Sequence, residues 1–100
     1  MHKMPPKVLT IREALKHPLR RKIIAYLLEN PGSSVRQLSR GLGISVGSLS
    51  GHLVILERVG LILEQRRSKR LELFVNSEVF LTIKEEFKGA GNLESSVAEV

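Results

Sequence analysis

The densest group of potential ligand-binding side chains is a run of cations in the last third of the sequence. Arg66, Arg67, Lys69 and Arg70 flank one serine, and cations grouped this closely can neutralise the phosphates of a polyanion. Residues 1–70 contain 14 Lys or Arg against 4 Glu, a net charge of +10, whereas residues 71–100 contain 2 against 6, a net charge of −4. This asymmetry favours a polyanionic partner, although solubility alone would explain part of it.

Other kinds of site chemistry lack the residues that they need. The chain has no cysteine, which excludes disulfides, thiolate metal sites and cysteine nucleophiles. His2, His17 and His52 stand in sequence contexts that give no chelating pair, so we expect no metal site. No motif pairs a nucleophile with a base, and no glycine-rich phosphate loop of the required spacing occurs. We therefore expect no catalytic residue, no enzymatic activity and no cofactor.

The length and composition suit one small domain. With 42% hydrophobic residues, the 100-residue chain can bury one modest core, which we expect within residues 10–88. Residues 1–9 are expected to form a flexible arm and residues 89–100 a frayed tail. No stretch approaches the roughly 18 consecutive apolar residues of a membrane span, and Met1–Lys7 lacks the apolar run of a signal peptide. We therefore expect a soluble, cytoplasmic protein without a membrane partner.

Helical spacing of apolar residues predicts the elements that must position the cations. The spacing begins at Thr10, and Pro18 then stands at a favourable first-turn position for a helix that runs to Glu29. Residues 30–32 would end this helix, because the residue before a proline avoids the helical conformation. The expected buried face of the helix consists of Leu19, Ile23, Ile24, Leu27 and Leu28.

Two shorter helices follow, separated by a glycine turn. One serine of the pair 33–34 caps the first of them, which is expected to run to Arg40, and residues 41–43 would form the turn. Ser45 caps the second, which is expected to stop at Gly60. Two short helices joined in this way form a helix-turn-helix unit.

After Gly60 the apolar period changes from about 3.6 to 2, which predicts two paired strands. The expected strands are residues 61–65 and 70–75, and the loop 66–69 between them would carry cations away from the body of the domain. The predicted fold class is thus mainly α with a small β-hairpin, an α+β arrangement.

A last helix is expected from a cap at Ser77 to about Phe87. Phe80, Ile83 and Phe87 form an apolar stripe on it, and so small a domain has limited core to cover this stripe and residues 11–15 as well. A second copy of the chain could bury both, so we expect a homodimer. Packing of the stripe on its own domain is the alternative.

The order and spacing of four segments are typical of a known family. The segments are His17–Ile24, Ser34–Gly43, Ile44–Leu53 and Leu56–Ile62. Together they resemble the ArsR-type winged helix-turn-helix transcriptional regulators, over roughly Ile11–Val75. The resemblance implies a homodimer that binds double-stranded DNA, with a recognition helix in the major groove and a β-hairpin wing along the adjacent backbone. Any small-molecule effector stays open, since metal sensing in this family uses clustered ligands that this chain lacks.

The resemblance places residues 45–52 at the exposed start of the recognition helix. Ser45, Ser48 and Ser50 carry short hydroxyl groups that can bind phosphates or base edges without holding the helix away from the groove. A role of Ser45 as the helix cap alone is an equally open interpretation. For His52 we favour a bond within the domain over contact with a base.

Gly47 and Gly51 depart from the family pattern, in which long polar residues are common near the exposed face of this helix. Each glycine weakens a helix interior by about 1 kcal/mol, and the expected gain is close approach of the backbone to DNA. Specificity would then depend on DNA shape and on Val46 against a thymine methyl group. Binding with little sequence preference is the alternative.

Further cations lie on the other helices. Arg36 and Arg40 are i,i+4 neighbours on the helix that crosses the DNA backbone in this motif, and we expect both to contact phosphates. For residues 20–22 a solvated helix face is favoured over phosphate contact, and His17 before Pro18 is expected to have a structural role at the helix start.

A rival interpretation is a winged-helix protein-docking module of a larger assembly, because a fold does not dictate a function. Such a module has no need of four cations at the tip of its wing, residues 66–70, whereas a duplex binder does. Duplex binding is therefore the preferred hypothesis.

Overall fold

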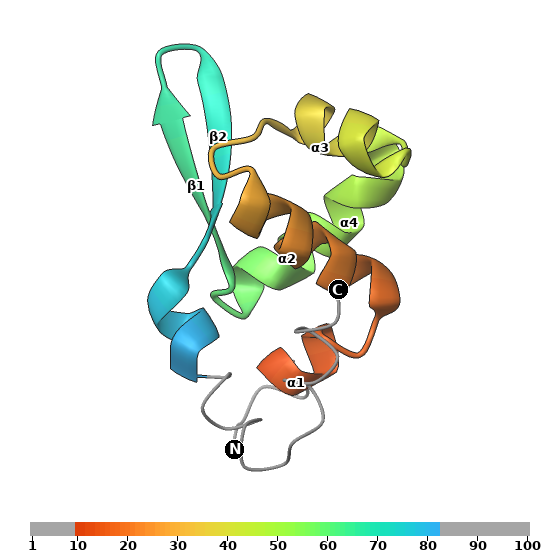
Figure 1. Cartoon of the computed structure of the whole chain (residues 1–100), viewed down its shortest axis with the longest axis vertical. Coiled ribbons are helices and arrows are strands. Elements are labelled where there is room, and N and C mark those ends of the chain that lie inside the picture. The colour runs from red at the N-terminus through yellow and green to blue at the C-terminus, as the bar shows by residue number, and fades with distance from the viewer. Residues whose placement is uncertain (1–9, 83–100) are drawn as a thin grey trace, which may run out of the picture.

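Figure 1 shows the computed structural model of the chain, which describes residues 10–82. The helices come first, and the hairpin that follows projects past them at one side of the molecule (Figure 1). This arrangement confirms the predicted class, mainly α with a small β-hairpin. The elements are α1 (Ile11–Ala14), α2 (Pro18–Glu29), α3 (Val35–Leu42), α4 (Val46–Arg58), β1 (Ile62–Arg67) and β2 (Arg70–Val75).

Side chains define where the first two helices begin. The Oγ1 atom of Thr10 accepts a hydrogen bond from the amide of Glu13, and the Glu13 carboxylate accepts one from the amide of Thr10, both at 3.1 Å. This reciprocal capping box starts α1. The amide of Leu19 donates to Nδ1 of His17 at 3.2 Å, and Pro18 fills the first position of α2. The predicted bounds of α2 and the structural role of His17 are confirmed.

The turn between α3 and α4 is shorter than predicted. Ser34 caps α3, but the helix does not end at Arg40 and instead continues through Gly41. Only Gly43 leaves the helix, with a left-handed φ of 68°. Gly41 lies against the ring of Tyr26, so its missing side chain serves the contact between α2 and α3 and not the turn.

The β-hairpin has a tighter tip than predicted. Its antiparallel register runs from Ile62 opposite Val75 to Arg67 opposite Arg70, so the loop contains only residues 68–69. Ser68 makes this turn possible by adopting a left-handed φ of 62°. The first strand therefore does not end at residue 65, and the cations at 66 and 67 belong to the strand ladder.

The hairpin is joined to the helix-turn-helix unit by a short β-bridge. Ser33, just before α3, pairs with Leu73 of β2. The amide of Leu73 donates to the Ser33 carbonyl at 3.0 Å, and the amide of Gly32 donates to the Leu73 carbonyl at 2.8 Å. These bonds hold β2 beside the start of α3.

A further helical segment covers residues 77–82, but Ser77 is not its cap. Asn76 has that role, because its Oδ1 accepts from the amide of Val79 at 3.5 Å and its carbonyl accepts from the amide of Phe80 at 2.9 Å. Residues 1–9, Ile83, Phe87 and the expected tail lie outside the described residues.

The core lies where α2, α3, α4 and the base of the hairpin meet. α2 turns Ile23, Ile24 and Leu27 inward, whereas Leu28 is 45% exposed and its predicted burial is wrong. Leu28 lies about 100° further around the helix than Leu27, beyond the face that the other elements cover. The largest fully buried side chains are Ile23, Leu27, Leu38, Leu49, Leu56, Leu61, Ile62 and Leu73.

Candidate nucleic-acid interface

The start of α4 presents a surface of small side chains. Leu49, Leu53 and Leu56 anchor the helix in the core, which leaves Ser48 and Ser50 on its exposed side. At Gly47 and Gly51 an added Cβ would meet no atom within 4 Å, so both positions are open, as the sequence predicts. Val46 stands at the same end with 42% of its surface exposed. Nothing on this part of α4 would hold a flat or grooved partner away from its backbone.

The serine hydroxyl groups of this surface already have bonds within the helix. Ser45 Oγ accepts from the amide of Ser48 at 3.1 Å and donates to Ser48 Oγ at 3.1 Å, so its capping role is confirmed. Ser50 Oγ donates to the Val46 carbonyl at 2.9 Å. The hydroxyl lone pairs of Ser48 and Ser50 can still accept further bonds.

His52 is held from inside the domain. The Arg20 Nε–H donates to its Nδ1 at 3.2 Å, and its ring packs edge-on against His17 with 4.6 Å between the ring centroids. Burial first, then the neighbouring His17 and Arg20, lower the pKa of His52, which favours the neutral ring that can accept from Arg20. This geometry agrees with the bond within the domain that we favoured.

The cations near the start of α2 also have partners in the domain. Arg20 Nη1 donates to the Ala14 carbonyl at 3.3 Å, and Arg21 Nη1 donates to the carbonyls of Leu15 at 2.6 Å and Lys16 at 3.1 Å. These carbonyls lie at the end of α1, where a helix leaves its backbone acceptors unpaired. Arg20 and Arg21 are therefore structural residues here and not merely a solvated face.

The wing carries four exposed cations. Arg66 and Arg67 are at the end of β1, Lys69 is in the turn and Arg70 starts β2, and all four are exposed. Arg67 and Arg70 face each other as the last pair of the ladder. Like charges directly opposite each other repel, which is tolerable only where an anion or solvent compensates.

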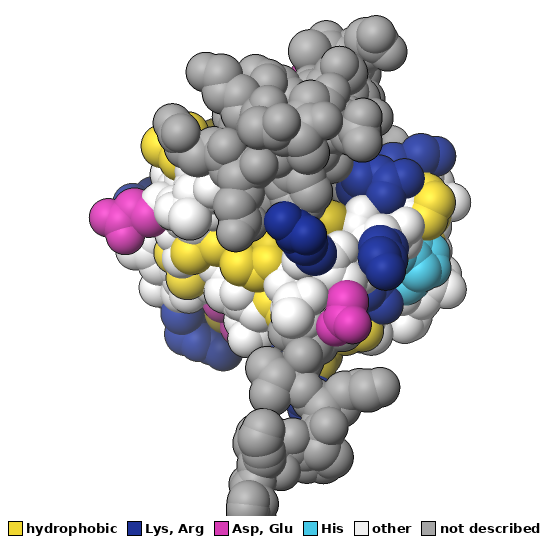
Figure 2. Space-filling model, turned by 90° about the horizontal axis from the view of Figure 1, so that it is seen from below, with side chains coloured by type: hydrophobic (Ala, Val, Ile, Leu, Met, Phe, Trp, Pro, Cys, Tyr) yellow, Lys and Arg dark blue, Asp and Glu magenta, His cyan; other side chains and the backbone are white. Residues whose placement is uncertain are grey.

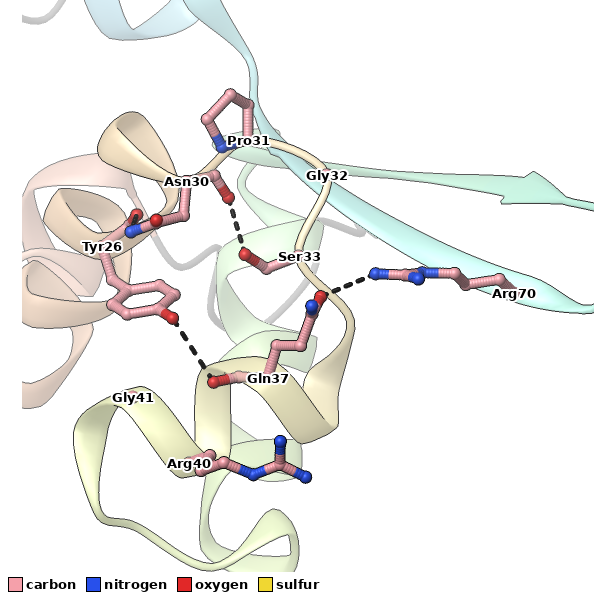
Figure 3. Close-up of a pocket in the computed structure, with 9 residues that line it drawn as sticks. All are labelled: Tyr26, Asn30, Pro31, Gly32, Ser33, Gln37, Arg40, Gly41 and Arg70. Carbon is pink, nitrogen blue, oxygen red and sulfur yellow. Dashed lines mark hydrogen bonds between the residues drawn. The ribbon is translucent and has the colours of Figure 1, made fainter.

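Arg70 connects the wing to α3. Its Nη2 donates to Gln37 Oε1 at 2.7 Å, and the same oxygen accepts from the amide of Ser34 at 2.9 Å. Figure 3 shows Gln37 between α3 and Arg70, with the side chain of Arg40 below it. Arg36 and Arg40 are both exposed, and Arg40 of α3 and Arg70 of the wing line the same pocket.

Known proteins share this arrangement. The family model of the bacterial regulatory proteins of the ArsR family matches residues 17–63. YgaV, an HTH-type transcriptional regulator of Escherichia coli, is 35% identical over 66 residues, which cover 66% of this chain and 67% of YgaV. The chain belongs to the ArsR family.

Other similar proteins agree with the ArsR assignment. An HTH-type transcriptional regulator of Methanocaldococcus jannaschii is 41% identical over 59 residues, which are 59% of this chain but only 15% of that protein. The crystal structure of a predicted DNA-binding transcriptional regulator from E. coli aligns with a TM-score of 0.64 and 32% identity, covering 78% of this chain and 82% of the other. Reduced HlyU from Vibrio cholerae aligns with the same TM-score at 29% identity, covering 78% and 82%. The fold is that of ArsR-type winged-helix regulators.

One structural residue of this ArsR-family chain, Gln37, escaped the sequence reasoning. Gln37 lies three residues after Ser34, the spacing of a capping box, so the sequence does carry a signal for its bond to the Ser34 amide. Its second bond, to Arg70, spans 33 residues and has no local signal. The approach of His17 to His52 is equally non-local, and residues 10–82 contain no group of three or more metal-ligating side chains.

One further property concerns membranes. Among residues 10–82, no helix has the length and apolar character needed to cross a bilayer.

Proposed function

We propose that this ArsR-family chain binds double-stranded DNA as a transcriptional regulator. The observation that carries the proposal is the exposed, side-chain-poor start of α4, in the same domain as a hairpin with four exposed cations. A helix of this shape can enter the major groove closely, and cations on a projecting hairpin can follow the phosphates beside it. YgaV and the M. jannaschii protein are both named as transcriptional regulators, which supports the same function.

The residues divide into two groups by the part of the duplex that they meet. We assign phosphate contacts to the cations of α3 and of the wing, because such contacts add affinity without conveying sequence. We assign groove contacts to the start of α4, with Val46 against a thymine methyl group, and His52, which Arg20 holds from inside the domain, at the edge of this surface. The first group is Arg36, Arg40, Arg66, Arg67, Lys69 and Arg70, and the second is Ser45, Val46, Gly47, Ser48, Ser50, Gly51 and His52.

We further propose a homodimer that acts in the cytoplasm, without catalytic activity. A two-fold dimer would present two α4 helices about one duplex turn apart, which suits a palindromic site. The docking-module alternative is less well supported, because such a module needs no cationic wing, and the similar proteins are named as transcriptional regulators.

The test introduces a negative charge at the proposed groove surface. Gly51→Glu adds bulk and charge where a Cβ meets no atom, so the fold should persist while duplex affinity is abolished in a mobility-shift titration at two salt concentrations. Ser77→Glu is the matched control, because it adds the same charge at an exposed first-turn position of the segment 77–82, at the base of the hairpin (Figure 1). We expect it to bind nearly as the parent does.

Unchanged duplex affinity of folded Gly51→Glu would mean that another surface meets the DNA. Absence of duplex binding by the parent even at low salt would overturn the proposal in favour of the docking module.

A further inference from the structure

A pocket of about 480 Å³ lies between the end of α2, the outer face of α3 and the start of β2, beside the proposed DNA surface (Figure 3). A volume of this size is within the range of small-molecule sites. Its lining contains two guanidinium groups and no carboxylate. The lining residues with polar side chains are Tyr26, Asn30, Ser33, Gln37, Arg40 and Arg70.

Several polar groups of the lining are already satisfied within the loop before α3. Ser33 Oγ donates to the Asn30 carbonyl at 2.7 Å, and Asn30 Nδ2 donates to the Tyr26 carbonyl at 3.0 Å. The Tyr26 hydroxyl donates only a long bond of 3.5 Å, to the Gln37 carbonyl. The donors that remain for a ligand include this hydroxyl, the side-chain amide of Gln37 and the two guanidinium groups.

The two guanidinium groups differ in their partners. Gln37 Oε1 orients Arg70 with a 2.7 Å bond but leaves its positive charge uncompensated, because an amide is neutral. Among residues 10–82, Arg40 has no hydrogen-bond or ion-pair partner. In Figure 3 Arg70 reaches from β2 to the side chain of Gln37, and the side chain of Arg40 extends from α3 below it.

We propose that this pocket binds a phosphate-type oxyanion between Arg40 and Arg70, with Gln37 holding Arg70 in place for it. Guanidinium groups bind phosphate through paired, charge-assisted hydrogen bonds, and two of them on different elements define a site for one anion. The anion is either a free phosphate ester or a backbone phosphate of the bound duplex. The second source rests on the proposed function, whereas binding of free phosphate does not.

The first experiment uses the full chain without DNA. Inorganic phosphate is titrated at constant ionic strength, with sodium chloride as the balancing salt, while NMR follows the arginine Nε–H and Gln37 side-chain amide signals. We expect saturable shifts confined to the pocket. Arg40→Ala should weaken phosphate binding by about tenfold or more, since it removes charge-assisted hydrogen bonds to the anion. Arg58→Ala, which removes an exposed guanidinium outside the lining, should leave the titration unchanged.

Gln37→Glu separates binding from folding. Glutamate preserves the capping box with Ser34 and can still hold Arg70, so the melting temperature should not fall. Its negative charge inside the pocket should abolish phosphate binding. Phosphate shifts that do not saturate, or that persist unchanged in both Arg40→Ala and Gln37→Glu, would overturn the proposal.

A second arm identifies the source of the anion and leaves the proposed function separately testable. If a saturating duplex blocks the phosphate shifts at the pocket, a backbone phosphate occupies the site. If the shifts persist with duplex bound, the site serves a free phosphate compound. Failure of the parent to bind any duplex would contradict the proposed function. The proposal that the pocket binds an oxyanion is tested by the phosphate titration alone, whatever the result with the duplex.

Discussion

Glu57, near the end of α4, carries a carboxyl group in an unfavourable place. Its Oε2 is covered and has no hydrogen-bond partner among residues 10–82, and the carboxyl of Glu64 on β1 lies beside it. Burial first, then the adjacent carboxyl group of Glu64 and its charge, raise the pKa of Glu57 to about 7. The folded protein therefore favours the protonated form of this side chain, and folding is coupled to pH.

The free energy of unfolding should fall as the pH rises. Below the ordinary pKa of 4.5 the group is protonated in both states, so it imposes no penalty. Between 4.5 and about 7 the unfolded chain loses the proton first, and the penalty grows until the folded protein ionises as well. Glu57→Gln should remove this slope in urea unfolding between pH 5 and 8 and should be more stable than the parent at pH 8.

Glu29→Gln is the control for that series, since it removes an exposed carboxylate at the end of α2. It should retain the pH dependence of the parent. An equal slope in the parent and in Glu57→Gln would show that Glu57 ionises in the folded state as it does in the unfolded chain.

One substitution should have opposite effects at two helical glycines. Gly51→Ala places a methyl group in open space and should stabilise α4 by about 1 kcal/mol, because alanine is the better helix former. Gly41→Ala should destabilise the protein, since its Cβ would overlap the Tyr26 ring and overpacking costs about 1–3 kcal/mol. Thermal unfolding measures both, and a higher melting temperature for Gly41→Ala would show that the ring moves aside freely.

At the scale of elements, the sequence predicted helix ends correctly where a residue at the boundary itself begins or ends the helix. Pro18 and residues 30–32 fixed α2, and Gly60 fixed the end of α4. The predicted end of α3 was wrong. Gly41 does not end the helix, and it lacks a side chain because the ring of Tyr26 on α2 occupies that space. The predicted length of the hairpin loop was wrong as well. Ser68 adopts a left-handed conformation, which serine does not usually favour, so the sequence contained no signal for the shorter turn.

The wing should act on affinity more than on sequence choice. Arg66→Ala with Arg67→Ala removes two cations from the end of β1 without disturbing the core, because both side chains are exposed. Binding to every duplex should weaken by a similar factor, and the log–log salt slope should flatten by up to about 0.9 for each phosphate that the wing no longer neutralises. Fluorescence anisotropy with two unrelated duplexes at several salt concentrations measures both quantities.

The matched control for the wing is the pair Lys22→Ala and Arg58→Ala, which removes the same charge from exposed positions on α2 and α4. It should change the slope less than the wing pair does. If the wing pair kept the salt slope and affinity of the parent, these arginines would only be solvated, and the docking-module alternative would gain support.

At the scale of the whole molecule, the exposed apolar side chains bear on how many copies of the chain associate. The domain covers part of these apolar side chains itself, because Ala14 and Leu15 are buried within it and Ile11 and Phe80 pack partly against its core. Leu81 is nevertheless 57% exposed, and Figure 2 shows a band of hydrophobic side chains on the face away from the wing tip. We expect a dimer in sedimentation at tens of micromolar protein, and a monomer there would contradict the homodimer.

The candidate site shows the same division between what is local and what is not. The cationic wing follows from periodicity and from the helix-ending Gly60, and the exposed start of α4 follows from the resemblance to ArsR-type regulators. The bond between Gln37 and Arg70 depends on the β-bridge at Ser33, which only the folded chain creates. The sequence therefore did not predict the residues that connect distant elements, whereas it did predict many of the residues that begin and end elements.

The contact between Gly41 and Tyr26 has a consequence for how this sequence can evolve. Because the ring occupies the space of a side chain at position 41, the two positions should covary among relatives. A lineage that replaced the tyrosine with a small residue would release the glycine, and the reverse order would pass through an unstable intermediate. Neutral substitutions at this contact should therefore occur in one order, in which Tyr26 is replaced before Gly41.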